Sequence, residues 1–189
     1  MNFLEERILK DGVICSEELL KVDSFLYHQL DIALVDEIAA EICRRYAGTA
    51  ITKVLTLEVS GIALGVSVAR QLGVPLVFAK KSKTKNISDD LYTVEVESFT
   101  HGKVNTVVVS KEFLKPGDRV LIVDDFLATG AALVGLKALV EQAGAEVVGA
   151  GIAVEKVFQG GGNLLREKGM RVESLAMIAS MDDTSLTFC

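Results

Sequence analysis

The sequence predicts an α/β fold in which a mostly parallel central sheet is flanked by helices. Strand-like and helix-like segments alternate from residue 54 onward, as repeated strand–helix–strand units do. The stretch Arg119–Asp125 is apolar on both faces, which is typical of a central parallel strand. Half of the 189 residues are hydrophobic, and no repeat, low-complexity segment or linker divides them. We therefore expect one packed domain over residues 1–189.

The first 50 residues predict helices for the most part. Residues 2–10 have the pattern of a short amphipathic helix. Residues 16–30 begin with a second helix-like segment, for which Ser16 is a candidate N-cap, and continue as an extended stretch. A longer helix is expected from about Ile32 to Tyr46, capped by Asp31.

The remaining chain predicts alternating strands and helices. Apolar or period-two patterns place strands at 54–57, 75–79, 92–97, 104–109, 119–125, 147–154 and 172–178. Helical spacing predicts helices at 62–72, 131–143 and 164–168. Residues 98–103 are expected to form a mobile hairpin loop, whereas residues 184–189 carry no pattern that predicts structure.

The charge of the chain limits the classes of partner. A net charge of −6 argues against a nucleic-acid platform, which normally carries a basic excess. Within this acidic chain, one local basic cluster comprises Lys80, Lys81, Lys83 and Lys85. Such a cluster suits a small polyanion better than a long one.

Cysteine usage and the N-terminus indicate the compartment. Cys15, Cys43 and Cys189 are far apart and have no metal-ligand spacing, which favours a reducing cytosol. The first residues carry no signal-peptide pattern, and no apolar stretch approaches the ~20 residues of a membrane helix. We expect a soluble, cytoplasmic protein with no membrane partner.

Residues 120–133 carry the most informative pattern. An apolar strand ends in the adjacent acids Asp124 and Asp125, at the strand end where ligands bind in such folds. A small-residue loop follows, with backbone N–H groups, a hydroxyl and a helix N-terminus that favour phosphate: Ala128, Thr129, Gly130, Ala131 and Ala132. Acids that bind a diol beside a phosphate cradle describe a site for ribose 5-phosphate. The alternative is that the acids merely cap the next helix.

This motif resembles the binding motif of the type I phosphoribosyltransferases for 5-phosphoribosyl 1-diphosphate (PRPP). The resemblance implies the fold of that family with a small N-terminal hood, the region that covers the nucleobase. It also implies that Asp124 and Asp125 act at the catalytic centre, holding the ribose hydroxyls directly or through Mg²⁺. Residues 128–132 would hold the 5-phosphate.

Two weaker motifs resemble the diphosphate-binding parts of the same family. The segment after the first sheet strand, Glu58, Val59, Ser60 and Gly61, is similar to the family's pyrophosphate loop, or is simply a strand-to-helix turn. Lys80 and Lys81 match basic residues that reach PRPP in type I dimers, often across the subunit interface, which implies a homodimer. Their alternative is a solvated charge run. The loop 98–103 corresponds to one that closes over the reacting centre.

The region beyond the PRPP motif indicates the base. Lys156 ends a predicted strand and can donate to an exocyclic purine carbonyl, while Phe126 or Phe158 offers a face for stacking. This favours a 6-oxopurine over adenine, which has an amino donor at that ring position. A surface lysine without a partner is the alternative for Lys156.

Nearly the whole chain resembles the xanthine phosphoribosyltransferases of bacterial purine salvage, through residues 4–8, 22–26 and 155–161. The resemblance implies that residues 1–30 form the hood and that Leu20, Tyr27 and Lys156 contact the base. Tyr27 stands where a smaller polar residue such as Asn is expected. Apart from the resemblance, Leu20 and Tyr27 read as packing residues.

The implied reaction joins xanthine to the phosphoribosyl group of PRPP and releases diphosphate. Two alternatives stay open. The base could be hypoxanthine, guanine or adenine, or the fold could sense PRPP without catalysis, as some regulators do. A regulator usually carries a DNA-binding domain or a basic RNA-binding face, and the acidic first 50 residues are too few for the former.

Overall fold

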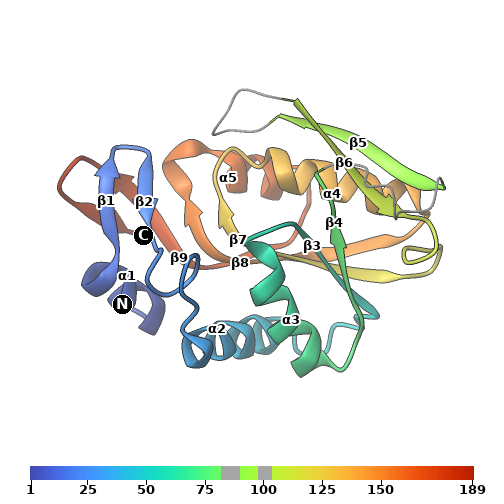
Figure 1. Ribbon diagram of the computed structural model, residues 1–189, viewed down its shortest axis with the longest axis horizontal. Helices are drawn as coiled ribbons and strands as arrows, with labels where there is room; N and C mark the ends of the chain where they lie inside the picture. The colour runs from blue at the N-terminus through green and yellow to red at the C-terminus, as the bar shows by residue number, and fades with distance from the viewer. Residues whose placement is uncertain (82–89, 98–103) are drawn as a thin grey trace.

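The computed structural model describes residues 1–81, 90–97 and 104–189 (Figure 1). Its centre is a six-stranded sheet with the strand order β10-β9-β8-β7-β3-β4, in which every pair is parallel except β10 with β9. The strands are β3 (Lys53–Leu57), β4 (Leu76–Ala79), β7 (Arg119–Leu127), β8 (Glu146–Lys156), β9 (Val172–Met181) and β10 (Leu186–Phe188). The predicted mostly parallel α/β fold is confirmed.

Helices cover both faces of this sheet (Figure 1). On one face, α2 (Ile32–Arg45) and α3 (Gly61–Leu72) pack into a core with residues such as Leu121 and Val123 of β7. On the other face, α4 (Ala131–Gln142) and α5 (Gly161–Glu167) pack into a second core that contains Ile122. Successive residues of β7 therefore point into opposite cores, as the apolar run of that strand predicted.

The N-terminal segment contains one correction to the sequence prediction. Helix α1 (Phe3–Asp11) forms as predicted, with a capping box between Asn2 and Glu5. The helix expected at the start of 16–30 is wrong, because β1 (Val13–Ser16) and β2 (Leu19–Lys21) form an antiparallel hairpin there. Ser16 therefore ends a strand and does not cap a helix. Asn2 ties this segment to β9 by donating to the carbonyl of Leu175 at 2.8 Å.

A separate antiparallel pair lies over α4 (Figure 1). It consists of β5 (Leu91–Glu97) and β6 (Val104–Ser110), with Val96 opposite Asn105. The pair is joined to the main sheet by two backbone hydrogen bonds between Lys80 and Val108, at 3.0 and 2.9 Å. It approaches α4 closely at Gly135, where a Cβ atom would lie 2.3 Å from a Val96 methyl group.

The last residues form a strand that the sequence did not predict. β10 (Leu186–Phe188) pairs with β9, so part of the segment 184–189 extends the sheet by one antiparallel strand. The turn before it is built by Asp182, whose carboxylate accepts hydrogen bonds from the backbone N–H groups of Thr184 and Ser185 at 2.8 and 2.7 Å.

Two further expectations concern the chain as a whole. No helix in the described part of the chain has the length and hydropathy that crossing a bilayer requires. All three cysteines lie in described residues and are free thiols.

Candidate functional site

The two predicted acids lie at the carboxyl end of β7, where both are nearly buried. Asp124 is 7% exposed and Asp125 is 6% exposed. The backbone N–H of Asp125 donates to Asp124 Oδ1 at 3.1 Å, whereas Asp125 Oδ2 is buried without a hydrogen-bond partner. A buried carboxylate oxygen that no protein donor satisfies is available for a ligand hydroxyl or a cation.

The pKa of Asp124 is raised well above its ordinary value. Burial is the main cause, and the negative charge of Asp125 adds to it, while the ammonium of Lys81 opposes both. Two carboxylates that share one poorly hydrated edge repel each other. The two ionised carboxylates therefore destabilise the unliganded site, and hydroxyl donors or a cation would relieve this repulsion.

The loop after β7 leads directly into the N-terminus of α4. Gly130 adopts a left-handed conformation, with φ of 86°, and precedes the first helical residue. No side chain caps this helix. The backbone N–H groups of its first turn are consequently free to bind an anion, which the positive end of the helix dipole also favours.

The segment that connects β3 to α3 lies next to the acids. Ser60 precedes α3 and donates a hydrogen bond from its hydroxyl to Asp125 Oδ1 at 3.1 Å. Gly61 begins the helix, and a Cβ atom there would lie 2.1 Å from Thr56 Oγ1 and 2.9 Å from Asp124 Oδ1. Only glycine permits this close approach. The peptide bond between Glu58 and Val59 is cis, and the Val59 side chain is largely exposed.

The neighbouring lysines Lys80 and Lys81 do not share one environment. Lys81 enters the space between Glu58 and the acids, and Glu58 fixes its backbone by accepting from the Lys81 N–H at 2.7 Å. Lys80 instead lies over the ring of Phe78, with 5.8 Å between its Nζ and the ring centroid. Lys80 lines a second hollow, at the β4 edge of the sheet.

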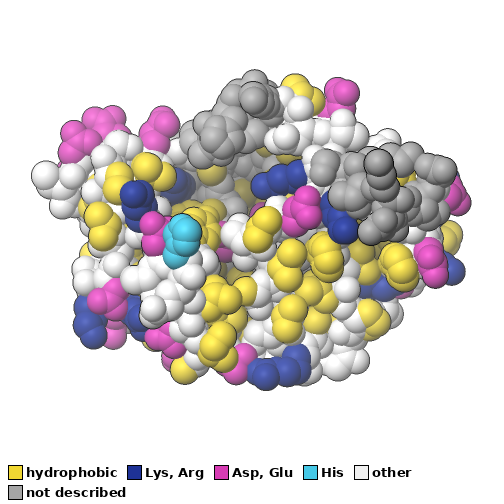
Figure 2. Space-filling view, in the orientation of Figure 1, with side chains coloured by type: hydrophobic (Ala, Val, Ile, Leu, Met, Phe, Trp, Pro, Cys, Tyr) yellow, Lys and Arg dark blue, Asp and Glu magenta, His cyan; other side chains and the backbone are white. Residues whose placement is uncertain are grey.

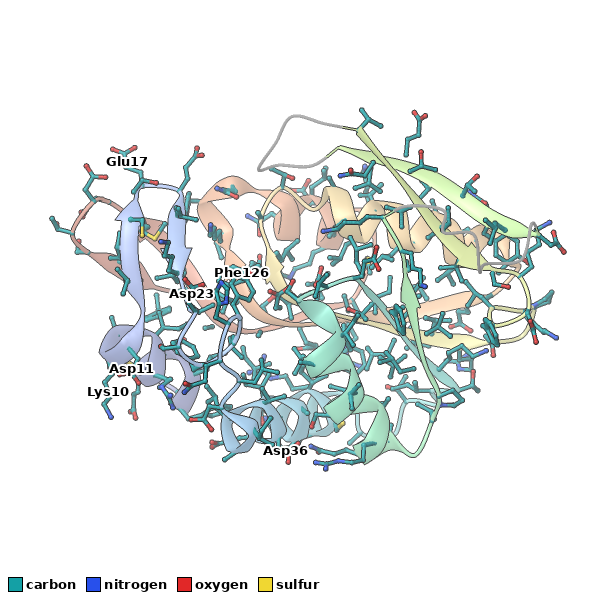
Figure 3. The ribbon with its side chains drawn as sticks, viewed as in Figure 1. Lys10, Asp11, Glu17, Asp23, Asp36 and Phe126 are labelled. Carbon is teal, nitrogen blue, oxygen red and sulfur yellow. The ribbon has the colours of Figure 1, made fainter. Side chains whose placement is uncertain are left out.

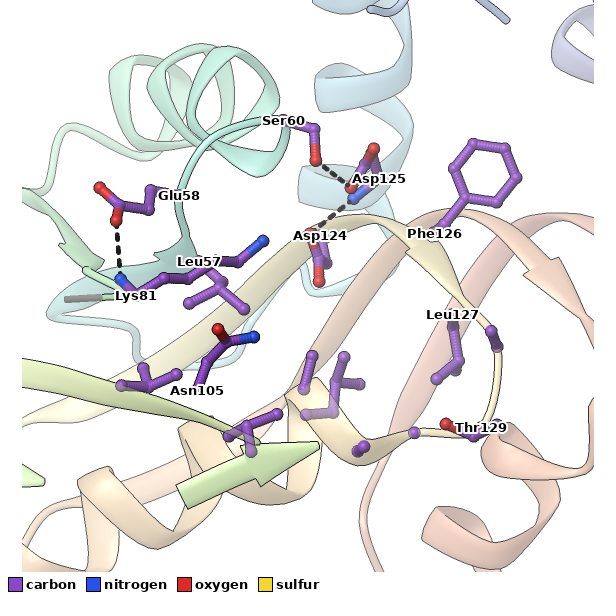
Figure 4. A pocket seen from close by; sticks show the side chains of 17 residues that line it. Leu57, Glu58, Ser60, Lys81, Asn105, Asp124, Asp125, Phe126, Leu127 and Thr129 are labelled. Carbon is purple, nitrogen blue, oxygen red and sulfur yellow. Dashed lines mark hydrogen bonds between the residues drawn. The ribbon is translucent and has the colours of Figure 1, made fainter. Parts of the chain in front are cut away.

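These parts enclose one cavity of about 260 Å³ (Figure 4). Its lining combines the acids, Phe126, the loop 128–132, Glu58, Ser60 and Lys81. The structure thus brings together the predicted ribose, 5-phosphate and diphosphate residues, except Val59, Gly61 and Lys80, which do not line the cavity. Gly61 is still in close contact with one of the lining acids, Asp124.

The predicted base residues gather around Phe126. The ring of Tyr27 is tilted against that of Phe126, with centroids 6.0 Å apart, and Lys156 Nζ lies 5.6 Å from the Phe126 centroid. Figure 3 shows Phe126 at the border between the N-terminal segment and the sheet. Because Phe126 also lines the cavity, the aromatic and cationic group adjoins the acids.

Burial shifts the pKa values of the two titratable side chains at this border, Lys156 and Tyr27. Burial lowers the pKa of Lys156, whose ammonium donates to the backbone carbonyl of Glu18. Burial and the nearby Asp125 carboxylate raise the pKa of the Tyr27 phenol, which therefore stays protonated at neutral pH. Leu20 is buried in the hydrophobic core against which Phe126 packs.

Sequence reasoning missed two features. Asn105 of β6 lines the cavity, and only the strand pairing that places β6 there could have identified it. Glu155, fully buried at the end of β8, accepts two hydrogen bonds from Arg166 of α5, at 2.8 and 2.6 Å, and another from Ser174. Glu155 thereby ties the end of β8, where Lys156 follows it, to α5 and β9.

Some predicted features fall outside the described residues. These are Lys83, Lys85 and the loop 98–103. Phe158, the alternative stacking residue, lies in the described single turn Val157–Gln159 and is 40% exposed.

Comparisons with known proteins agree with this geometry. A family model described as a phosphoribosyl transferase domain matches residues 21–171. A xanthine phosphoribosyltransferase from Ruminiclostridium cellulolyticum is 52% identical over 188 residues, which cover 100% of this chain and 99% of that protein. One from Lachnoclostridium phytofermentans is 53% identical over 96% of this chain and 94% of that protein.

A solved structure shows the same fold at low sequence identity. The adenine phosphoribosyltransferase from Thermoanaerobacter pseudethanolicus superposes with a TM-score of 0.77 at 23% identity, covering 92% of this chain and 99% of that one. The family match over most of the chain and the identity to full-length relatives are decisive. The chain belongs to the phosphoribosyl transferase family.

Proposed function

We propose that the protein transfers the 5-phosphoribosyl group of PRPP to xanthine, giving xanthosine 5′-monophosphate and diphosphate. The observation that carries the proposal is a single cavity in which two buried carboxylates face an uncapped helix N-terminus and a lysine. Carboxylates accept from sugar hydroxyls, and free amides and ammonium bind phosphates. Xanthine as the base is supported by the names of the full-length relatives.

In this proposal each part of PRPP has its own set of residues. The loop 128–132 binds the 5-phosphate through backbone N–H groups, and Asp124 and Asp125 accept from the ribose hydroxyls. The diphosphate lies toward Lys81 and the segment Glu58–Gly61. Lys81 reaches into the cavity from the side opposite the loop 128–132 (Figure 4).

The acids also fit Mg²⁺ bound together with PRPP. Mg²⁺ in nucleotide and phosphate sites uses one or two carboxylates and completes its shell with substrate oxygens and water. Asp124 and Asp125 supply two carboxylates, one with an unpartnered buried oxygen. No cluster of three or more acidic, histidine or cysteine ligands occurs within the described residues, so substrate oxygens would be required. When bound, Mg²⁺ supplies positive charge beside the diphosphate.

The base is proposed to lie against Phe126, beneath the N-terminal segment. Lys156 donates to an oxygen of the purine, as a buried ammonium with one carbonyl partner can still do. Tyr27 packs on the same ring and offers its hydroxyl. Residues 1–30 then act as the hood of a single domain over 1–189, since the Lys156–Glu18 and Tyr27–Phe126 contacts join them to the sheet.

The chemistry requires one substitution at C1′ of the ribose. The bond between N9 of xanthine and C1′ forms with inversion, the bond from C1′ to the diphosphate oxygen breaks, and diphosphate leaves with the electron pair. Asp124 and Asp125 offset positive charge that develops on the ribose, and Lys81 offsets negative charge on the leaving diphosphate. Xanthine loses a proton readily near neutral pH, and water takes up the proton released as the N9–C1′ bond forms, so no strong base on the protein is invoked.

We also propose that the protein works as a homodimer in the cytoplasm. Lys80 points to a hollow of about 650 Å³ at the β4 edge, lined by apolar side chains that include the partly exposed Phe78 and Phe113. Apolar side chains gather on this side of the molecule (Figure 2). A second subunit would cover them and place Lys80 near an interface. Three free thiols suit a reducing compartment.

A panel of bases tests the function. The protein is incubated with PRPP, Mg²⁺ and xanthine, guanine, hypoxanthine or adenine, and the nucleotide and diphosphate are quantified. Xanthosine 5′-monophosphate should form fastest. Faster conversion of another base would refute xanthine as the substrate, and binding of PRPP without release of diphosphate would indicate a sensing protein.

Asp125→Asn should lower turnover by roughly a hundredfold with the fold intact.

A further inference from the structure

The cavity contains an amide side chain that the family motif does not include. Asn105 lies on β6, outside the PRPP loop and the diphosphate segment, and lines the cavity from the side of the β5–β6 pair. We propose that Asn105 is a PRPP-binding residue, whose side-chain amide donates a hydrogen bond to a phosphate oxygen. This inference rests on the proposed function and adds a binding residue to it.

The Asn105 side chain is free to serve a ligand. This side chain forms no hydrogen bond with any part of the chain that the structure describes, although it is only partly exposed. Figure 4 shows its amide directed into the cavity, between Lys81 and the turn that carries Thr129. An unpaired amide in a half-buried position gains more from a ligand acceptor than one in open water.

The position of Asn105 is held from two sides. Its strand neighbour Val96 packs against α4 at Gly135, within the first turns of the helix whose N-terminus faces the cavity. Three residues further along β6, Val108 is bonded to Lys80 at the end of β4. These contacts therefore hold Asn105 in the wall of the cavity that Lys81 and the loop 128–132 also line.

The chemistry of the lining identifies phosphate as the partner. Among the described residues that line the cavity, Asn105 has the one side-chain amide, and its neighbours Lys81 and the loop amides are donors as well. The acceptors Asp124 and Asp125 lie on β7, as ribose ligands should. An N–H donor next to other phosphate donors complements a phosphate oxygen.

The test compares two substitutions at Asn105 with a matched control. Asn105→Ala should raise the KM for PRPP about ten- to a hundredfold, as loss of a hydrogen bond to a charged group does, and leave the KM for xanthine within about twofold. Asn105→Asp should raise it at least as much, since a carboxylate repels phosphate. Thr106→Asp adds the same charge on the opposite, exposed face of β6 and should behave like the wild type.

Competition with product fragments identifies the phosphate. Weaker inhibition of Asn105→Ala by diphosphate would assign the contact to the leaving group, and weaker inhibition by ribose 5-phosphate would assign it to the 5-phosphate. An unchanged KM for PRPP in Asn105→Ala, or an equal increase in Thr106→Asp, would overturn the inference while wild-type turnover still supported the proposed function. A wild-type protein without turnover would refute the function itself.

Discussion

Gly161 offers a sharp test of how the phosphate loop is supported. It begins α5, and its N–H donates to the carbonyl of Ala128 at 3.2 Å. A Cβ atom at Gly161 would lie 2.3 Å from both that carbonyl oxygen and the Thr129 carbonyl carbon, and 2.5 Å from the Gly130 nitrogen. All three are backbone atoms of the loop that is proposed to bind the 5-phosphate.

The expected cost of Gly161→Ala follows from these distances. Gly161 is the first residue of α5 and is not in the left-handed region, so alanine is conformationally allowed there and the expected cost comes from the close contacts alone. Ordinary contact begins near 3.4 Å, so the two backbones must separate by about 1 Å. Such overpacking costs about 1–3 kcal/mol, which lowers the melting temperature by roughly 2–12 °C. A 1 Å displacement of a binding loop should lower kcat/KM for PRPP by up to about a hundredfold.

Thermal melts and initial rates at varied PRPP measure both effects, with Gly169→Ala as the control. Gly169 has a φ of 82° and no neighbouring atom within 4 Å of a Cβ. Its alanine variant should lose about 1 kcal/mol through backbone strain and keep kcat/KM for PRPP. The reasoning is refuted if Gly161→Ala melts like the wild type with unchanged kcat/KM, or if both variants lose the same kcat/KM.

Three further substitutions probe the charges around the site. Because the fold raises the pKa of Asp124, ionising this side chain destabilises the folded protein. The loss of stability begins at about pH 4 and increases as pH rises through the raised pKa. Asp124→Asn, which keeps the acceptor for the Asp125 N–H, should thus raise the free energy of unfolding by about 0.5–2 kcal/mol at pH 7. Urea titrations should show the gain disappear by about pH 4. Lys156→Met should raise the KM for xanthine about tenfold or more and leave that for PRPP nearly unchanged; equal increases would contradict its role. Glu155→Gln should cost about 3 kcal/mol, at the lower end for a buried pair because Arg166 is 30% exposed, and an unchanged urea midpoint would contradict this.

The parts of the fold that could be predicted are those specified by local pattern. The β7 strand, the acids at its end and the glycine before α4 lie within fourteen consecutive residues, and each has a local physical reason. The β1–β2 hairpin was missed because Ser16–Leu20 contains good helix formers, yet five residues cannot sustain a helix alone. Long-range contacts decide its structure: Leu20 is buried, and Glu18 accepts from Lys156.

Two other features that differ from the sequence prediction have local signals in the sequence. Asp182, followed by Thr184 and Ser185, is the pattern of a side-chain-built turn, so a strand after it could have been anticipated. Adjacent strand residues point to opposite faces, so Lys80 and Lys81 could not both enter the cavity of one subunit. The Glu155–Arg166 pair has no such local signal, because it joins the end of β8 to a helix formed after a glycine-rich turn.

The helix caps of this protein divide according to their distance from the cavity. Asn2 and Asp31 cap α1 and α2 with side-chain oxygens. No side chain caps α3 and α4, which begin at the cavity, or α5, which begins against the loop 128–130. Opposite the free amides, Asp125 keeps a buried oxygen without a donor. Free N–H donors and one unpartnered carboxylate oxygen thus lie on separate walls of one cavity (Figure 4). A ligand that carries phosphates at two ends and a diol between them can bind the free N–H groups and the carboxylate oxygen at the same time. The unsatisfied groups destabilise the unliganded protein, and binding of PRPP removes that cost and gains affinity from it.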